Sequence, residues 1–241
     1  MGVNSMKGRT MKRRTFTLAA VGLAVVALGV AGCGDDDDDG GSSASTGATT
    51  QADTRGPATE TGAAELRATL TAGLQEHVYL AGIAIANGVQ QGLDSPEFEA
   101  AAASLDENSV ALSDAIGSVY GDDAGKQFLA LWRDHIGFFV EYTKAKAEGD
   151  DATAQKAKRK LDGYRTEFGA FLSAANPELT QEAVAMELKP HVDSLFATID
   201  AVVAGSPDTF ELLREAAGHM PATANTLAGA IATQFPDKFG S

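Results

Sequence analysis

Four histidines carry the strongest chemical signal in this chain of 241 residues. His135 and His191 each stand 15 residues before a helix-start signal, and His77 stands 18 residues before one. In a helical projection these three imidazoles lie near the centre of the apolar stripe of their own helix. His219 differs, because it lies at the flank of its stripe. Three of the four histidines are therefore expected to occupy equivalent buried positions.

This arrangement predicts a metal or haem site. Imidazole is the commonest metal-binding side chain, and three equivalent imidazoles around a pseudo-threefold axis suit zinc, copper or iron. Glu187 and Glu215 stand four residues before His191 and His219, on the same helical faces. Each is a candidate carboxylate ligand, or an acceptor for the proton of a ligating imidazole. The expected cofactor is accordingly a divalent metal ion or a haem.

The same pattern has a structural explanation, which the sequence leaves open. A duplicated unit copies a buried structural histidine as readily as it copies a ligand, and buried polar groups need hydrogen-bond partners. Asn108 and Tyr164 fall at matching positions of the repeat and are candidate partners within each hairpin. The chain also lacks the HxxxH and HxxxE patterns, and the paired ExxH motifs of di-iron bundles.

No residue pattern identifies an enzyme. The sequence has no glycine-rich phosphate loop and no GxSxG, and Cys33 is its one cysteine. Trp132, Phe138 and Phe139 are expected to be core residues.

The leading hypothesis is a non-catalytic binding or interaction domain for an unknown protein or small molecule. The alternative is a histidine-based metal- or haem-binding protein.

Helices must position these histidines. From residue 61 onward Ala, Leu, Glu, Lys and Gln dominate, and apolar residues recur at helical spacing. Breakers divide this region into six segments, with Ser95-Pro96 and Ser206-Pro207 read as N-cap followed by the first helical residue. Further breaks are expected at Gly121-Asp122, Gly149-Asp150 and Asn176-Pro177, and Pro221 should kink or break the last helix.

These breaks recur in register, which predicts an all-α six-helix bundle or array. It would be built from three αα-hairpin repeats of about residues 61–121, 122–177 and 178–236, within a helical domain of residues 61–241. The terminal Gln234-Phe235-Pro236, together with histidine-bearing helices, resembles secreted all-α proteins of unassigned function. That resemblance implies a fold type and no activity.

The N-terminus is typical of an export signal, with a basic head and then an uncharged run of Leu, Ala, Val and Gly over residues 18–30. The sequence Val30-Ala31-Gly32-Cys33 at its end resembles the lipobox of bacterial lipoproteins. The resemblance implies that residues 1–32 are a cleaved signal peptide and that the Cys33 thiol carries membrane lipid. The expected location is the outer face of the cytoplasmic membrane.

Arg13 and Arg14, followed by Phe16, resemble a twin-arginine export signal. Lys12 and Thr17 depart from that pattern, and ordinary Sec signals also contain arginine pairs, so both export routes remain open.

Residues 33–60 are rich in Gly, Asp, Ser, Thr and Ala and are predicted to form a disordered acidic tether. Loss of the signal would remove five basic residues and no acidic one, leaving 14 basic against 33 acidic residues and a net charge of −19. Such a surface repels phosphate backbones, which excludes nucleic acid as a partner.

Overall fold

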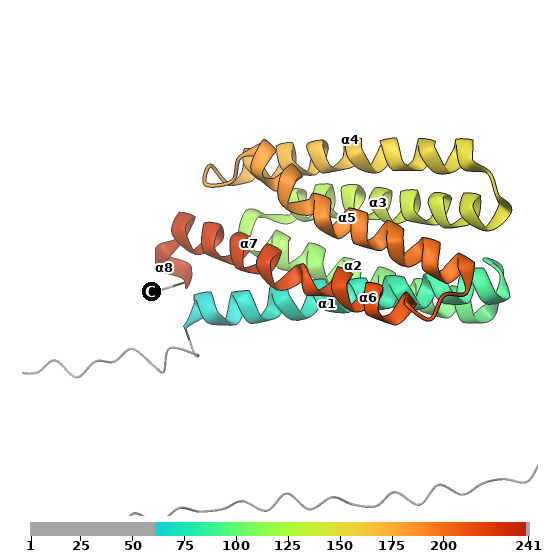
Figure 1. Cartoon of the computed structure of the whole chain (residues 1–241). Helices are drawn as coiled ribbons and strands as arrows, with labels where there is room; N and C mark the ends of the chain where they lie inside the picture. Colours follow the sequence, from blue (N-terminus) through green and yellow to red (C-terminus); the bar gives the residue numbers. More distant parts are fainter. Residues whose placement is uncertain (1–60, 240–241) are drawn as a thin grey trace, which may run out of the picture. The chain divides into compact units, whose positions relative to one another are not determined.

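The computed structural model describes residues 61–239, and its described part consists of helices joined by short turns (Figure 1). The predicted all-α class is confirmed. The predicted signal peptide, lipidated Cys33 and tether lie outside the described residues. Within residues 61–239, no helix combines the length and the apolar character needed to cross a membrane.

The helices are α1 (Gly62–Gln91), α2 (Pro96–Tyr120), α3 (Asp122–Glu148), α4 (Asp151–Ala175), α5 (Gln181–Ala204), α6 (Thr209–Gly218), α7 (Met220–Gln234) and the single turn α8 (Pro236–Phe239).

Local capping explains where four of the five long helices begin, and α3 is the exception. The side chains of Thr61, Ser95, Asp150 and Thr180 each accept a hydrogen bond from the backbone N–H three residues later, at 3.0 to 3.2 Å. Each bond satisfies one of the N–H groups that a helix start leaves without a partner. Pro96 follows the Ser95 cap at the first helical position, as expected from the sequence.

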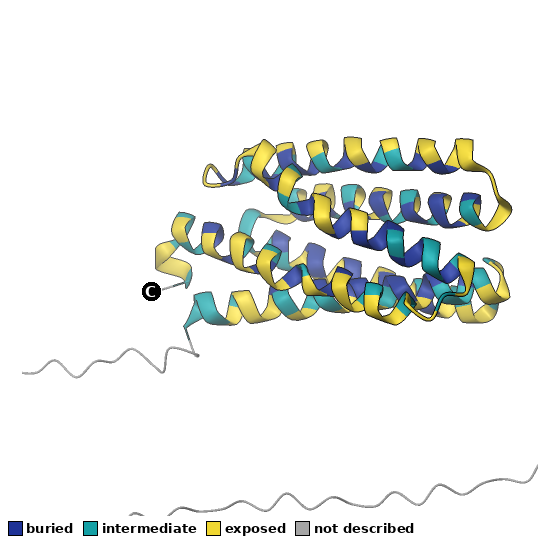
Figure 2. Ribbon diagram, viewed as in Figure 1, coloured by how far each residue is buried: buried dark blue, intermediate teal, exposed yellow. Residues whose placement is uncertain are grey.

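The helices α1, α3 and α5, each the first helix of a predicted hairpin, pack against one another at the centre of the domain. The returning helices α2 and α4 each lie between two of these, and the last segment, α6 with α7, packs against α5 and α1 to complete the circuit (Figure 1). Buried residues follow the inward faces of the helices in Figure 2. An inward-facing side chain of α1, α3 or α5 therefore points to a shared centre.

The sixth predicted helix departs from the expectation at its start. It does not start at Ser206 and Pro207, because these residues form a turn in which the Ser206 hydroxyl accepts from the backbone N–H of Asp208, and α6 begins at Thr209. The expected effect of Pro221 is confirmed, because the segment divides at His219 into α6 and α7, with Pro221 in the first turn of α7. Proline has no N–H to continue the helical ladder and its ring clashes with the preceding turn, which accounts for the break.

The C-terminal Gln234-Phe235-Pro236 has a structural role. The Gln234 side chain accepts a hydrogen bond from the Tyr120 hydroxyl at 3.1 Å and donates one to the carbonyl of Ala175 at 3.0 Å. The Phe235 ring packs edge-on against the Tyr120 ring, with centroids 5.7 Å apart. The motif thus joins the end of α7 to the ends of α2 and α4.

Candidate functional site

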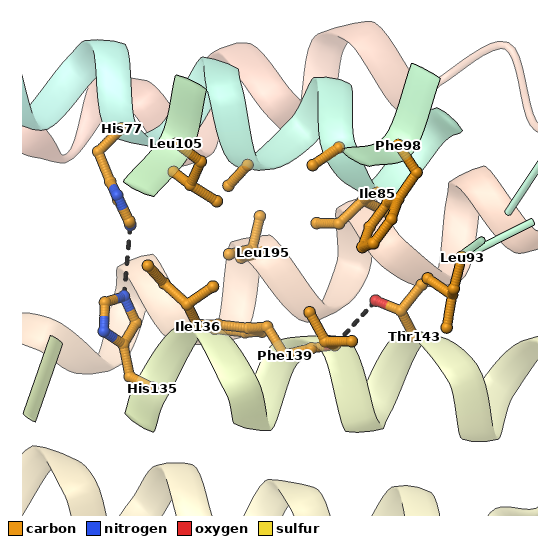
Figure 3. Close-up of a pocket in the computed structure, with 13 residues that line it drawn as sticks. His77, Ile85, Leu93, Phe98, Leu105, His135, Ile136, Phe139, Thr143 and Leu195 are labelled. Atoms are coloured by element: carbon orange, nitrogen blue, oxygen red, sulfur yellow. Dashed lines mark hydrogen bonds between the residues drawn. The ribbon is translucent and has the colours of Figure 1, made fainter. Parts of the chain in front are cut away.

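Two predicted site residues meet at the centre of the domain. His77 projects from α1 and His135 from α3, and their Nε2 atoms lie 3.3 Å apart. Figure 3 shows the two imidazoles pointing at each other at one end of a small pocket. His77 is 2% exposed and His135 is 5% exposed, so the predicted burial is confirmed. The contact joins the first helices of two predicted hairpins rather than helices of one hairpin.

Aromatic rings enclose this pair. The indole of Trp132 lies with its centroid 4.7 Å from the His77 ring and 4.6 Å from the His135 ring. The phenol ring of Tyr164 stacks on His135 at 4.9 Å with an interplanar angle of 22°. Both aromatic side chains are buried. The imidazole pair is thus surrounded by buried aromatic rings.

His191, from α5, lies near the same centre. It is 7% exposed, and it lines a cavity of about 40 Å³ together with His135, Trp132 and Tyr164. Its Nδ1 atom lies 3.4 Å from the carbonyl oxygen of Ala216 on α6. Since a carbonyl oxygen only accepts, this contact favours the tautomer with the proton on Nδ1, which leaves a lone pair on Nε2.

All three buried histidines are held neutral. Burial, assisted by the nearby His191, lowers the pKa of His77 from 6.5 to about 3. Burial also places the pKa of His135 well below its ordinary value, assisted by the charges of His77 and His191. For His191 burial lowers the pKa to about 4, against the opposing effect of the Ala216 carbonyl. A neutral imidazole can donate a lone pair to a metal ion without first losing a proton.

The hydrogen bonding around the pair is incomplete. In an N–H···N bond between the two Nε2 atoms, one ring carries its proton on Nε2 and the other on Nδ1. Neither Nδ1 has a hydrogen-bond partner among the described residues, and the buried indole N–H of Trp132 is also without one. The Trp132 carbonyl, one turn earlier, raises the pKa of His135 only weakly. A buried polar atom that also lacks a water partner costs about 1–3 kcal/mol, so a partner is expected for these three atoms.

The hydrogen-bond partners proposed from sequence do not serve this role. Asn108 was expected to bond a histidine, but its amide donates to the Gly73 carbonyl at 3.0 Å and to the Glu76 carboxylate at 2.8 Å. Tyr164 contacts His135 through its ring face. The prediction that Asn108 is the hydrogen-bond partner of a histidine in its hairpin was therefore wrong, because its amide faces the outer side of α1.

The remaining candidate ligands lie away from the imidazole pair. Glu215 is exposed, and Glu187 is half-buried and accepts a hydrogen bond from the Thr226 hydroxyl at 3.2 Å. His219 is half-buried at the break between α6 and α7. Across residues 61–239, no group of three or more His, Cys, Asp or Glu side chains is arranged to hold one metal ion. The structure thus brings two of the six candidates into direct contact and a third, His191, close to them.

The spaces beside the pair are small. A cavity of about 30 Å³ lies on the side of α2 and is lined by both histidines, Ile85, Phe98 and Leu105 (Figure 3). The second, of about 40 Å³, is the one shared with His191. Binding pockets for molecules of drug size or larger measure about 300 Å³ or more. A single ion or a few small atoms fit beside the histidines as the helices stand, whereas a haem does not.

Sequence reasoning identified the three histidines but treated Trp132 only as a core residue. The available signal was its position three residues before His135, which places both side chains on one helical face. Comparisons of the chain with family models, with curated proteins and with solved structures found no match in any of the three.

Proposed function

We propose that this domain binds a transition-metal ion between the Nε2 atoms of His77 and His135. The observation that carries the proposal is their separation of 3.3 Å. Two nitrogen ligands at about 2.0–2.1 Å from a metal, at a tetrahedral angle, lie about 3.3–3.4 Å apart. The pair therefore already has the spacing of two ligands on one ion, and little movement of α1 or α3 is required.

The electrostatics of the site support the same proposal. Both imidazoles are neutral at physiological pH, because burial lowers the pKa of each. In the metal-bound form both Nε2 atoms use their lone pair and both protons sit on Nδ1. The ion replaces the N–H···N hydrogen bond. One ring must move its proton from Nε2 to Nδ1, but neither imidazole has to lose a proton.

The place of action follows from the N-terminal motif. We infer that acylated Cys33 anchors the protein in the outer face of the cytoplasmic membrane, since the lipobox-like Val30-Ala31-Gly32-Cys33 ends an export signal. Replacement of Cys33 by Ala is expected to abolish lipid labelling and to release the protein or leave its signal uncleaved. Unchanged lipid labelling of Cys33→Ala would refute the anchor.

Metal analysis of the purified protein tests the site. We expect about one transition-metal ion per chain after exposure to metal and removal of excess, and loss of that ion in His77→Ala and His135→Ala. His219→Ala is the matched control, because this half-buried histidine lies outside the pair. Metal well below one ion per chain, or metal content that these two substitutions leave unchanged, would contradict the proposal.

A second candidate, an interaction domain without metal, is supported by the exposed apolar side chains of Tyr79 and Ile83 on α1 and of Phe210 on α6. These two helices pack against each other, and Phe210 is 80% exposed. Exposed apolar groups on neighbouring elements are typical of protein contact surfaces. A photo-crosslinker placed at Ile83 is expected to capture a partner in intact membranes, whereas one at the exposed Gln155 on α4 is the control.

A further inference from the structure

We propose that the ion held by His77 and His135 is monovalent copper, Cu(I), with His191 as its third ligand. This inference rests on the proposed metal-binding function and adds the identity and charge of the ion. Its support comes from the charge of the site, the number of converging donors and the aromatic surroundings.

The first argument is electrostatic. The cavities beside the pair are lined by apolar and aromatic side chains, by imidazoles and by threonine hydroxyls, with no carboxylate among the described residues that line them. The carboxylates of Glu187 and Glu215 lie toward the surface. The free energy of burying an ion scales with the square of its charge, so a divalent ion costs about four times as much as a monovalent one here. A site with neutral ligands and no anion therefore favours the lower charge.

The second argument is the number of donors. Zinc in proteins is almost always four-coordinate, which would require two ligands beyond His77 and His135. Cu(I) is a closed-shell d¹⁰ ion that is stable with two or three nitrogen donors, and imidazole suits copper. The two nitrogens that converge in this structure are thus a sufficient start for Cu(I) and an insufficient one for zinc.

The third ligand is available from α5. His191 lines the same cavity as His135, and its Nδ1 contact with the Ala216 carbonyl leaves the Nε2 lone pair free. Histidines that bind a metal through one nitrogen usually donate a hydrogen bond from the other nitrogen to a carbonyl or carboxylate, as Nδ1 of His191 does. Because α1, α3 and α5 pack around one centre, an inward movement of this ring would give a trigonal site with one histidine from each hairpin.

The aromatic rings complete the argument. The indole of Trp132 lies within 5 Å of both imidazoles by ring centroid, and Tyr164 stacks on His135. The face of an aromatic ring attracts a cation, most strongly where water is excluded. Any ring face turned toward the ion adds to the stabilisation that the imidazoles provide.

The test is a competitive titration of the purified full-length chain carrying Cys33→Ser, so that no thiol competes. Cu(I) is added without oxygen in the presence of a chromophoric chelator, with Ag(I) as a redox-stable probe and Zn(II) as the divalent comparison. We expect one equivalent of Cu(I) or Ag(I) to bind about 100-fold more tightly than Zn(II). Binding should be lost in His135→Gln and weakened about tenfold in His191→Gln, with His219→Gln unchanged.

The outcomes separate the two proposals. Binding of Zn(II) as tight as that of Ag(I), and dependent on His77 and His135, would overturn the Cu(I) assignment and leave the metal site in place. Absence of binding by any of the three ions, or binding that His135→Gln does not alter, would overturn both. If His135→Gln does not fold, His77→Gln and the rise in Tm of the unsubstituted chain with one equivalent of Ag(I) decide instead: no rise in Tm contradicts the site.

Discussion

The indole ring of Trp132 lies against the imidazole of His77, with ring centroids 4.7 Å apart and planes tilted by 55°. Trp132 projects from α3 and His77 from α1, so this contact crosses between two of the central helices. Trp132 is the single tryptophan of the chain and is buried. Its fluorescence therefore reports on the part of the core that contains the histidine pair.

We expect His77→Ala to lower the free energy of unfolding by about 2–4 kcal/mol, because it enlarges a cavity and leaves Nε2 of His135 buried without its partner. Tryptophan emission should shift to longer wavelength as water reaches the indole. Urea unfolding and emission spectra measure both effects, and His219→Ala is the control. An unshifted spectrum together with unchanged stability would contradict the packing described for Trp132.

Acid is expected to destabilise the fold in a defined range. His77 and His191 have pKa values of about 3 and about 4 in the folded domain, below the ordinary value of 6.5, chiefly because of burial. Between pH 6.5 and about 4 the unfolded chain thus binds more protons than the folded one. This contribution to stability is complete well above pH 6.5 and falls as the pH falls, by about 3 kcal/mol for these two histidines together between pH 6.5 and pH 5.

Urea unfolding at pH 7.5, 6.5 and 5 measures this loss. The variant His191→Gln has one fewer such group, so its stability should fall less steeply over the same range. A profile that is flat from pH 6.5 to pH 5, or a slope that His191→Gln does not reduce, would show that the buried histidines do not govern the acid response.

The close approach of α4 and α5 at Gly169 yields a third prediction. A Cβ atom at this position would lie 2.4 Å from the backbone carbonyl oxygen of Gln181, which cannot move aside as a flexible side chain does. Gly169→Ala should therefore destabilise the domain by about 2–4 kcal/mol. A Cβ atom at Gly163, on the same helix, would meet open space. Gly163→Ala should therefore stabilise the domain by about 0.5–1 kcal/mol. Thermal unfolding should show a lower Tm for Gly169→Ala and a higher Tm for Gly163→Ala than for the unsubstituted chain.

The fourth prediction concerns the contact between Asn176 and Tyr120. The side-chain NH₂ of Asn176 donates to the Tyr120 hydroxyl at 3.0 Å, and the side-chain oxygen Oδ1 of Asn176 accepts from the backbone N–H of Glu178 at 2.9 Å. Asn176 is 1% exposed. We expect Asn176→Ala to cost about 1–3 kcal/mol in urea unfolding, and the exposed Asn225→Ala on α7 to change stability by less than about 0.5 kcal/mol. Equal effects of the two substitutions would count against this contact.

The sequence by itself determined the helical class, most helix starts and the burial of three histidines. These features depend on neighbours a few residues apart: Ser95 caps its own helix through a bond to Phe98, and the place of His135 in its apolar stripe follows from the helical repeat. Local spacing was less informative at Ser206, where a hydroxyl that could cap a helix forms a turn with Asp208 instead.

Only the tertiary structure decided which histidines meet. His77 and His135 are 58 residues apart, and their 3.3 Å contact depends on how α1 and α3 cross and on the rotation of each helix about its axis. Neither quantity is encoded in the spacing along one helix. For the same reason Glu187 and Glu215, which share a helical face with a histidine in projection, lie toward the surface while Trp132 joins the pair. Helix periodicity sets which residues are buried, and packing between helices sets what they touch.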